Sequence, residues 1–447
     1  MDSPKIEPMP PVATAVGLPW DVPMADPVSA LAEARRSLGD TFVVDSGDDR
    51  YLFTFSPEGV AGFYALPEEK ASKGVADWKM LRRKLPDEIF VGRRTLPHEL
   101  FGRHDVVAYL ANVERALDET IDELGFAGEI DVFHLTRRLG HRIGLASWGG
   151  PGSASGERFN RLARAFDILD GAESFVHPDA MAAVAATGKS AEYDALAIVS
   201  DELCAALKEL PGAEAEHPLF SRIAIAWGDQ PAPRRSVGVA LDVCLVHVAS
   251  MSNLFAALGW ALIDLFAHSA AANEVRSGNR ARAEMGALES IRLAQRSIMA
   301  RAVLVPVRID VGTTVHEVSA GVTIATLLPL TNTSAAPGLD SWDPNRWNRR
   351  RLADTSMLAA TELVTAFGHG RHTCPAQPFS LSAMVTATTR LLATFDFEPT
   401  WIDRPKPVQA QIGGVARAAD PCPVRYRRRK GRSGAQAGVV LGEQRND

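Results

Sequence analysis

Apolar residues recur at helical spacing along most of the chain, and glycines and prolines separate the repeats. The segment Asp26–Leu38 predicts a helix that Gly39 ends. Two short strands joined by a turn are predicted at 41–44 and 51–55. Further helices are predicted over 98–124, 131–143, 156–169 and 181–210, and short strands at 393–398 and 424–429. The pattern therefore indicates a mostly α protein with small β-sheets (α+β).

The longest apolar stretch is Ser236–Ala270, which would extend roughly 50 Å as one helix. A membrane-spanning helix is the alternative, because about 20 apolar residues suffice to cross a bilayer. Polar residues interrupt the stretch at Asp242, His247, Ser250, Ser252, Asn253 and Asp264, and such groups are costly in lipid. We therefore expect a core helix that crosses a large globular unit.

One cysteine lies at the end of a glycine-punctuated loop, Phe367–Ala376. Gly368 and Gly370 permit backbone angles that other residues avoid, so free amides in the loop would point towards the sulfur of Cys374. Pro375 suits the first turn of a helix. A buried cysteine that acts only as a small apolar side chain is the simpler interpretation. The loop geometry favours a thiolate that binds a metal.

A second group of residues combines an acid with two arginines. Glu289 and Arg292 are three residues apart and share one face of a predicted helix. Such a pair is usually a solvated surface contact. Here the segment Trp342–Trp347, which contains Arg346, follows the pair and precedes the cysteine loop.

The composition excludes several classes of protein. The chain has 447 residues, 46% hydrophobic and 23% charged, with a formal net charge of −6, which argues against a nucleic-acid partner. The cysteines (Cys204, Cys244, Cys374 and Cys422) show neither zinc-finger spacing nor a disulfide framework, so a reducing cytoplasm is expected. Residues 1–23 are proline-rich and lack the pattern of a signal peptide or membrane anchor.

The loop from Phe367 to Ala376 closely resembles the haem-binding signature of cytochrome P450, FxxGx[H/R]xCx[G/A], at every position. The resemblance implies that Cys374 is the axial thiolate of haem b, that Phe367 packs on the sulfur and Gly370 shapes the loop. It also implies a long central helix over the haem, with the cysteine loop below it. His372 would face a haem propionate. Thiolate ligation favours O–O cleavage.

Other positions follow from the same resemblance. Glu289, Arg292 and Arg346 would form a buried triad that supports the cysteine loop. Arg301, with Arg296 as its rival, and Arg94 would bind the propionates. One cytochrome P450 domain would cover residues 19–432, after a flexible N-terminus (1–18) and before a disordered tail (433–447).

The long helix departs from the usual family pattern at its centre. Ala249 and Ser250 are small enough for a helix that passes close over a flat cofactor. Ser252 and Asn253 occupy the places of the acid–alcohol pair that delivers protons in most members. Together with the segment at Glu289, this resembles the sterol 7α-hydroxylase and prostacyclin synthase branch. An amide does not titrate, so Asn253 would orient water or dioxygen, with Ser252 in a water chain; a packed polar pair is the alternative.

The resemblance implies a monooxygenase that inserts one oxygen atom from O2 into a lipophilic small molecule, such as a sterol, lipid or terpenoid-like compound. Electrons would come from a separate ferredoxin and its reductase, because no flavin domain follows the cysteine loop. A haem-thiolate isomerase or peroxide-dependent enzyme and a non-enzymatic haem sensor are the alternatives. We expect a cytoplasmic protein with no membrane span and no nucleic-acid partner.

Overall fold

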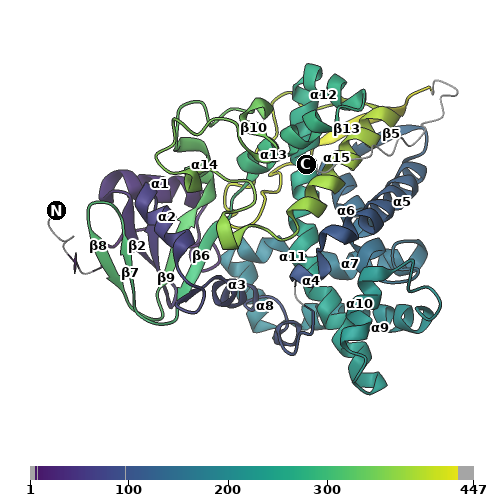
Figure 1. The fold of residues 1–447 in the computed structure, drawn as a ribbon, viewed down its shortest axis with the longest axis horizontal. Coiled ribbons are helices and arrows are strands. Elements are labelled where there is room, and N and C mark those ends of the chain that lie inside the picture. The colour runs from purple at the N-terminus through teal and green to yellow at the C-terminus, as the bar shows by residue number, and fades with distance from the viewer. Residues whose placement is uncertain (1–5, 8, 96, 431–447) are drawn as a thin grey trace, which may run out of the picture.

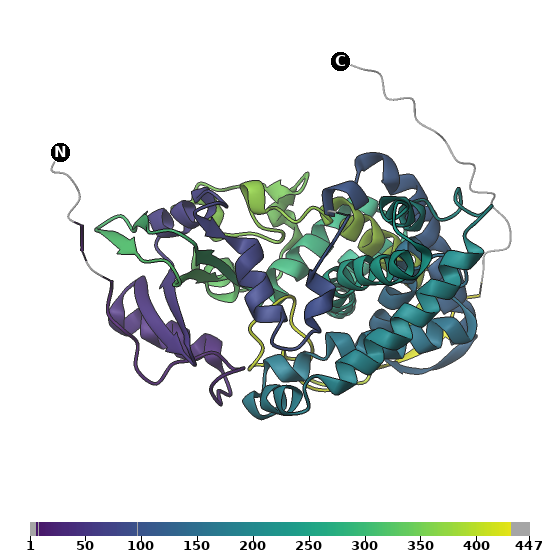
Figure 2. The same ribbon diagram turned by 90° about the horizontal axis from the view of Figure 1, so that it is seen from below.

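The computed structural model, which describes residues 6, 7, 9–95 and 97–430, separates a β-rich end from a larger helical end (Figure 1). The same division is visible after a quarter turn (Figure 2). The prediction of a mostly α protein with small sheets is confirmed. The helices are α1 (Pro27–Leu38), α2 (Pro57–Ala65), α3 (Lys73–Leu81), α4 (Pro97–Leu100), α5 (Val106–Leu124), α6 (Val132–Trp148), α7 (Gly156–Asp170), α8 (Pro178–Ala186), α9 (Ser190–Glu209), α10 (Pro218–Ala226), α11 (Ala232–Ala267), α12 (Ser269–Arg276), α13 (Arg280–Ala294), α14 (Leu328–Ser334) and α15 (Gln377–Thr394).

The strands form four small sheets among the described residues. The five-stranded sheet has the order β2 (Thr41–Ser46), β3 (Asp49–Thr54), β9 (Thr323–Leu327), β6 (Ile298–Val303) and β4 (Ala71–Ser72). A three-stranded sheet joins β12 (Phe395–Pro399), β13 (Pro423–Arg428) and β5 (Ala127–Asp131). The others join β1 (Ile6–Glu7), β8 (Val315–Val318) and β7 (Val307–Asp310), and β10 (Trp347–Asn348) with β11 (Arg351–Leu352).

The predicted hairpin near the N-terminus is the start of the large sheet. Strands β2 and β3 pair antiparallel from Thr41 opposite Thr54 to Ser46 opposite Asp49. Phe42 and Phe53 stack with ring centroids 6.0 Å apart, and both are fully buried. Burial of these aromatic rings against α1 gives the β-rich end a core of its own.

Helix α11 is the central element of the helical end, and it covers most of the stretch that the sequence marks as a long core helix. By length and composition it is the one helix of the described chain that could cross a membrane, yet 67% of its most apolar window is buried inside the protein. Its polar residues Asp242, His247 and Asp264 are buried and hydrogen-bonded to neighbouring elements. A core helix explains these partners.

Three boundaries differ from those predicted. The expected helix over 98–124 is broken near Gly102 into α4 and α5. The expected helix over 181–210 is broken into α8 and α9, because Gly188 and Lys189 adopt positive φ angles of 59° and 61°. The segment 1–18, which we expected to be flexible, contains the fully buried Leu18. The expected tail at 433–447 lies outside the described residues.

A buried polar chain links α11 to α6 and α7. The Trp148 indole N–H donates to His247 Nδ1 at 3.2 Å, and His247 Nε2 lies 2.9 Å from His141 Nδ1. His141 Nε2 lies 2.9 Å from Asp167 Oδ1, and Arg137 also contacts that carboxylate. Because the indole only donates, the neutral His247 donates through Nε2, and the chain runs in one direction to Asp167.

This chain predicts that the protein loses stability in mild acid. Burial, reinforced by His141, holds the pKa of His247 well below its ordinary value of 6.5. Below pH 6.5 the unfolded chain takes up a proton that the folded chain does not bind. The free energy of unfolding therefore decreases as the pH is lowered, by up to about 1.4 kcal/mol per pH unit. Urea unfolding midpoints at neutral and mildly acidic pH measure this fall.

The variant His247→Phe is the control for that assignment. It should be less stable at neutral pH, because Trp148 loses its acceptor, but its stability should depend less on pH. An equally steep acid dependence in this variant would assign the effect to another group.

Candidate functional site

The cysteine loop folds tightly because two of its glycines have positive φ angles. Gly368 and Gly370 have φ angles of 79° and 55°. A Cβ on Gly368 would lie 2.5 Å from the carbonyl oxygen of His372, so only glycine fits there. The backbone N–H of Cys374 donates to the carbonyl of Phe367 at 2.7 Å, which closes the loop before α15 begins.

The sulfur of Cys374 faces backbone donors. Burial raises the pKa of its thiol, and the N–H groups of Ala376 and Gln377, with the positive charge of Lys73, partly oppose that rise. These amides belong to the start of α15, so the helix presents its positive end to the sulfur. The arrangement suits a thiolate that binds a cation.

A cavity of about 520 Å³ lies between this loop and α11. Cys374 and Phe367 form one wall, and Ala249, Ser250 and Asn253 of α11 lie on another. Ala249 is exposed to this space although its helix crosses the core. Ser252 does not line the cavity, so the structure separates the predicted pair Ser252–Asn253.

The rim of the cavity is mainly cationic. Lys73, Arg93 and Arg371 are its cations, His372 is a further lining residue, and Asp77 is the acidic residue among the lining side chains. Among the described residues no group of three or more His, Cys, Asp or Glu side chains gathers in a metal-binding arrangement.

His372 and Arg301 act together at this rim. Arg301, fully buried on β6, donates to the carbonyls of Phe63 and Ala71, and its Nη1 lies 2.7 Å from His372 Nε2. Because a guanidinium only donates, His372 accepts through Nε2 and carries its own proton on Nδ1. Burial and Arg301 lower the pKa of His372. Arg301 therefore lies behind His372 and does not line the cavity itself.

The rival arginine, Arg296, serves a different segment. Its guanidinium donates to the carbonyls of Gln409 and Gln411, each at 2.6 Å. Its backbone pairs with Gly413 and Gly414. It holds the loop that returns to the cavity from the C-terminal part of the chain, away from the cationic rim.

The structure places Arg93, in the position next to the predicted Arg94, on the cavity wall. Arg94 is exposed: it pairs with Asp229 and lies over the ring of Trp227 at 4.8 Å. The buried carboxylate of Asp242 accepts from the backbone N–H groups of Arg94 and Thr95 and fixes this segment against α11. The sequence alone did not show that Asp242 holds the segment at Arg94 and Thr95, because Asp242 is 148 residues away from Arg94.

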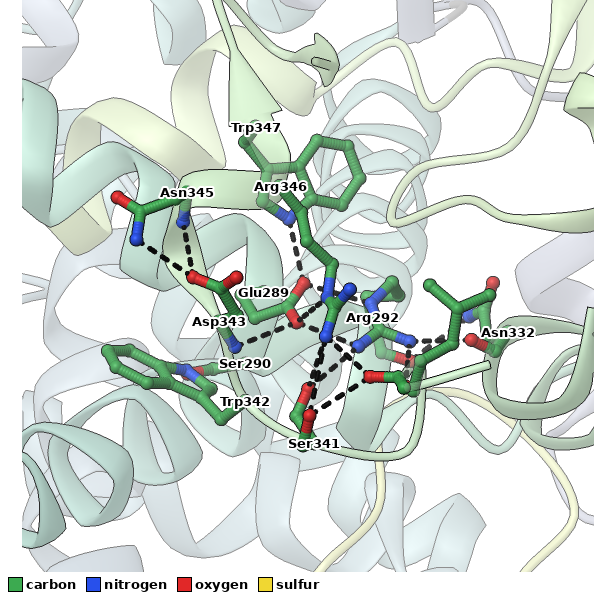
Figure 3. Close-up of polar contacts among 12 residues, drawn as sticks. Glu289, Ser290, Arg292, Asn332, Ser341, Trp342, Asp343, Asn345, Arg346 and Trp347 are labelled. Atoms are coloured by element: carbon green, nitrogen blue, oxygen red, sulfur yellow. Dashed lines mark hydrogen bonds and ion pairs between the residues drawn. The ribbon is translucent and has the colours of Figure 1, made fainter. Parts of the chain in front are cut away.

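Glu289, Arg292 and Arg346 meet, as the family resemblance implied, and Figure 3 shows the carboxylate among its donors. Arg292 donates to both oxygens at 2.9 and 2.7 Å, and Arg346 donates to one at 3.0 Å. The indole of Trp347 and the backbone N–H of Asp343 add two further bonds. Glu289 and Arg292 are fully buried, so each charge depends on the others.

Asn332 connects this cluster to the cysteine loop, and no sequence pattern pointed to this residue. Its amide donates to the carbonyls of Arg292 and Thr365 at 3.0 and 2.9 Å, and its oxygen accepts from the N–H of Thr365. The Thr365 hydroxyl then bonds to the N–H of Phe367 and the carbonyl of Gly368. The cluster thereby fixes the loop that carries Cys374.

Comparison with solved structures identifies the architecture. The chain matches the cyanobacterial CYP120A1 with retinoic acid bound, at 14% identity and a TM-score of 0.70, over 94% of this chain and 99% of that one. It matches the haem domain of cytochrome P450DA at 17% identity and a TM-score of 0.70, over 96% and 98% of the two chains. A mutant of that domain matches at 16% identity, over 95% and 98%, with a TM-score of 0.68. No family model and no curated protein matches the sequence.

Removal of one charge from the buried cluster should destabilise the protein severely. Glu289→Gln leaves two arginines beside a neutral amide, so we expect a loss of about 3–5 kcal/mol in the free energy of unfolding. Glu284→Gln is the matched control, because Glu284 pairs with Arg350 near the surface. That change should stay within about 0.5 kcal/mol. Equal losses in urea unfolding would contradict a special role for the buried carboxylate.

Proposed function

We propose that this chain, which has the cytochrome P450 fold, is a haem-thiolate monooxygenase that inserts one oxygen atom from O2 into a lipophilic small molecule. The observation that carries the proposal is the position of Cys374: its sulfur faces helix-start amides and lies on the wall of a cavity that α11 closes. Cys374 would hold the iron of a haem through its sulfur, and this proposal is supported by the fold and by the loop that carries the cysteine. The other haem ligands come from the porphyrin.

The residues around the cavity fit haem b. Arg93 Nε is buried and has no hydrogen-bond partner in the described protein, although the residue lies on the cationic rim. An orphaned guanidinium N–H beside Lys73, Arg371 and His372 suits the two carboxylates of a porphyrin. Ala249 offers a small side chain to its flat face. When bound, the haem supplies the oxygen-activating chemistry.

The remaining walls favour an apolar substrate. They include Leu245, Val246, Leu254, Ala257, Met299 and Leu328. Two polar side chains lie among them: the Ser297 hydroxyl donates to Gln295 Oε1 at 2.8 Å, and the Gln295 amide donates to the carbonyl of Ala366. Such a wall binds a largely hydrocarbon molecule and orients it through few polar groups. The retinoic acid in the similar CYP120A1 structure is a ligand of that kind.

A second hollow of about 630 Å³ lies against the cysteine loop. Phe367, Gly368 and Thr373 line both this hollow and the main cavity, so the loop is the wall between them. Arg349, Arg350 and Arg351 lie around the second hollow. We place the docking site of an acidic ferredoxin here, because opposite charge favours encounter and the path to the sulfur is short.

We place the protein in the cytoplasm. Its four cysteines are free, as expected in a reducing compartment.

An isomerase or peroxide-dependent reaction is the second candidate. The observation that favours it is Asn253, because neither the amide nor any other α11 side chain on the cavity wall titrates. Turnover with NADPH, ferredoxin and its reductase supports the monooxygenase. Turnover of a peroxide without a reductant supports the second candidate.

The thiolate assignment is tested by replacing single cysteines. Haem-loaded wild-type protein should give the thiolate-type band in its reduced carbonyl spectrum, and Cys374→Ser should abolish that band. Cys204→Ser is the matched control, because Cys204 is also half-buried but lies on α9. A band that survives Cys374→Ser would refute the proposed function.

The rim assignment is tested with two adjacent arginines. Arg93→Ala should weaken haem retention by roughly tenfold or more, because it removes a charged donor to a carboxylate. Arg94→Ala should leave retention near the wild-type value, since that side chain pairs with Asp229 on the outside. Transfer of haem from each variant to apomyoglobin measures its rate of haem loss. Faster haem loss from Arg94→Ala than from Arg93→Ala would instead assign the propionate contact to Arg94.

A further inference from the structure

Asn253 makes one contact that its proposed place near oxygen does not explain. Its Oδ1 accepts the backbone N–H of Val415 at 2.9 Å, although the two residues are 162 positions apart. A backbone N–H can only donate, so the amide oxygen must face Val415 and the NH2 group must point away from it. Asn253 and Val415 both line the cavity, and no partner of the NH2 group lies among the described residues.

The loop that meets Asn253 is built for this approach. Gly414 has a φ angle of 59°, and a Cβ there would lie 2.5 Å from Asn253 Oδ1. Arg296 holds the same loop from the other side, because its N–H donates to Gly414 and its carbonyl accepts from Gly413, both at 2.9 Å. The contact between α11 and this loop is therefore fixed from both directions.

We propose that Asn253 is a positioning residue with two fixed halves. Its oxygen latches the loop 411–415 to α11, and the latch aims its NH2 group into the cavity as a donor to an oxygen atom. The nature of that atom rests on the proposed function: it belongs either to the substrate or to a diatomic ligand of the haem. The latch itself does not depend on haem.

The latched amide and an alcohol at this position differ in the hydrogen bonds that they can make. A hydroxyl group both donates and accepts, and it rotates between the two. The latched amide has its acceptor occupied and offers N–H groups that do not ionise. Asn253 therefore binds and orients an oxygen acceptor, and it does not pass a proton along.

The latch is tested by hydrogen exchange at the amide of Val415 in the protein as purified. Asn253→Ala removes the acceptor and should speed this exchange by about tenfold or more. Asn253→Asp keeps an oxygen for Val415 and should leave the exchange close to wild type. Unchanged exchange in Asn253→Ala would overturn the latch.

A pair of glycine variants tests the latch from the loop side. Gly414→Ala should speed exchange at Val415, because the new methyl group displaces Asn253 Oδ1. Gly413→Ala is the control: it also has a positive φ angle, 145°, but a Cβ there meets nothing within 4 Å. Equal exchange at Val415 in both variants would assign the effect to backbone strain and contradict the latch.

The donor half is tested in haem-loaded protein at mildly alkaline pH, where an aspartate is ionised. The probes are cyclododecanone and cyclododecane, whose affinities are compared through Soret shifts and equilibrium dialysis, and carbon monoxide, whose stretch is read by infrared spectroscopy. If the acceptor is a substrate oxygen, Asn253→Asp lowers the ketone-to-hydrocarbon affinity ratio by about tenfold.

If the acceptor is the diatomic ligand, the ketone-to-hydrocarbon affinity ratio is the same in wild type and Asn253→Asp. The C–O stretch of bound carbon monoxide then differs between the two proteins. If neither observable changes, the donor half is overturned. A wild-type protein without the thiolate-type carbonyl band would refute the proposed function, and the exchange measurement would still decide the latch.

Discussion

The carboxylate of Glu289 is the interaction on which the site depends. It is fully buried, and it compensates a fully buried arginine and a second one at the edge of the same cluster. The buried guanidinium of Arg292 would be expensive without this anion, and the isolated anion would be equally so. The ion cluster therefore assembles as a unit or not at all, and it forces α13 and the segment around Arg346 into one arrangement. Asn332 and Thr365 carry that arrangement to the cysteine loop through neutral hydrogen bonds.

The cysteine loop lies between two hollows and is supported by bonds from Thr365. One side of it borders the main cavity and the other borders the basic hollow near Arg349. Positive φ angles at Gly368 and Gly370 bend the loop, and its shape is held by its own backbone bonds, such as that from the Cys374 N–H to the Phe367 carbonyl, and by the Thr365 hydroxyl.

The sequence predicted the parts of this site that are set locally. The cysteine loop depends on glycine positions within ten residues, the acid–arginine pair on helical spacing, and the long helix on continuous hydrophobicity. It could not predict contacts that the tertiary fold decides. Whether Arg93 or Arg94 faces the cavity depends on Asp242, and the position of Arg301 behind His372 depends on carbonyls of Phe63 and Ala71. The break between α8 and α9 depended on Gly188, which the alanine-rich pattern around it obscured.

The titratable groups of α11 show why Asn253 has no acidic neighbour to assist it. His247 has both ring nitrogens occupied, one by the Trp148 indole and the other by His141, and the resulting chain runs away from the cavity to Asp167. Asp242 accepts from Thr95 and the indole of Trp227, and it lies outside the cavity lining. His247 and Asp242 thus each hold a neighbouring element against the buried part of the helix. The α11 side of the cavity therefore offers no ionisable side chain, and Asp77 is the carboxylate among the other lining residues.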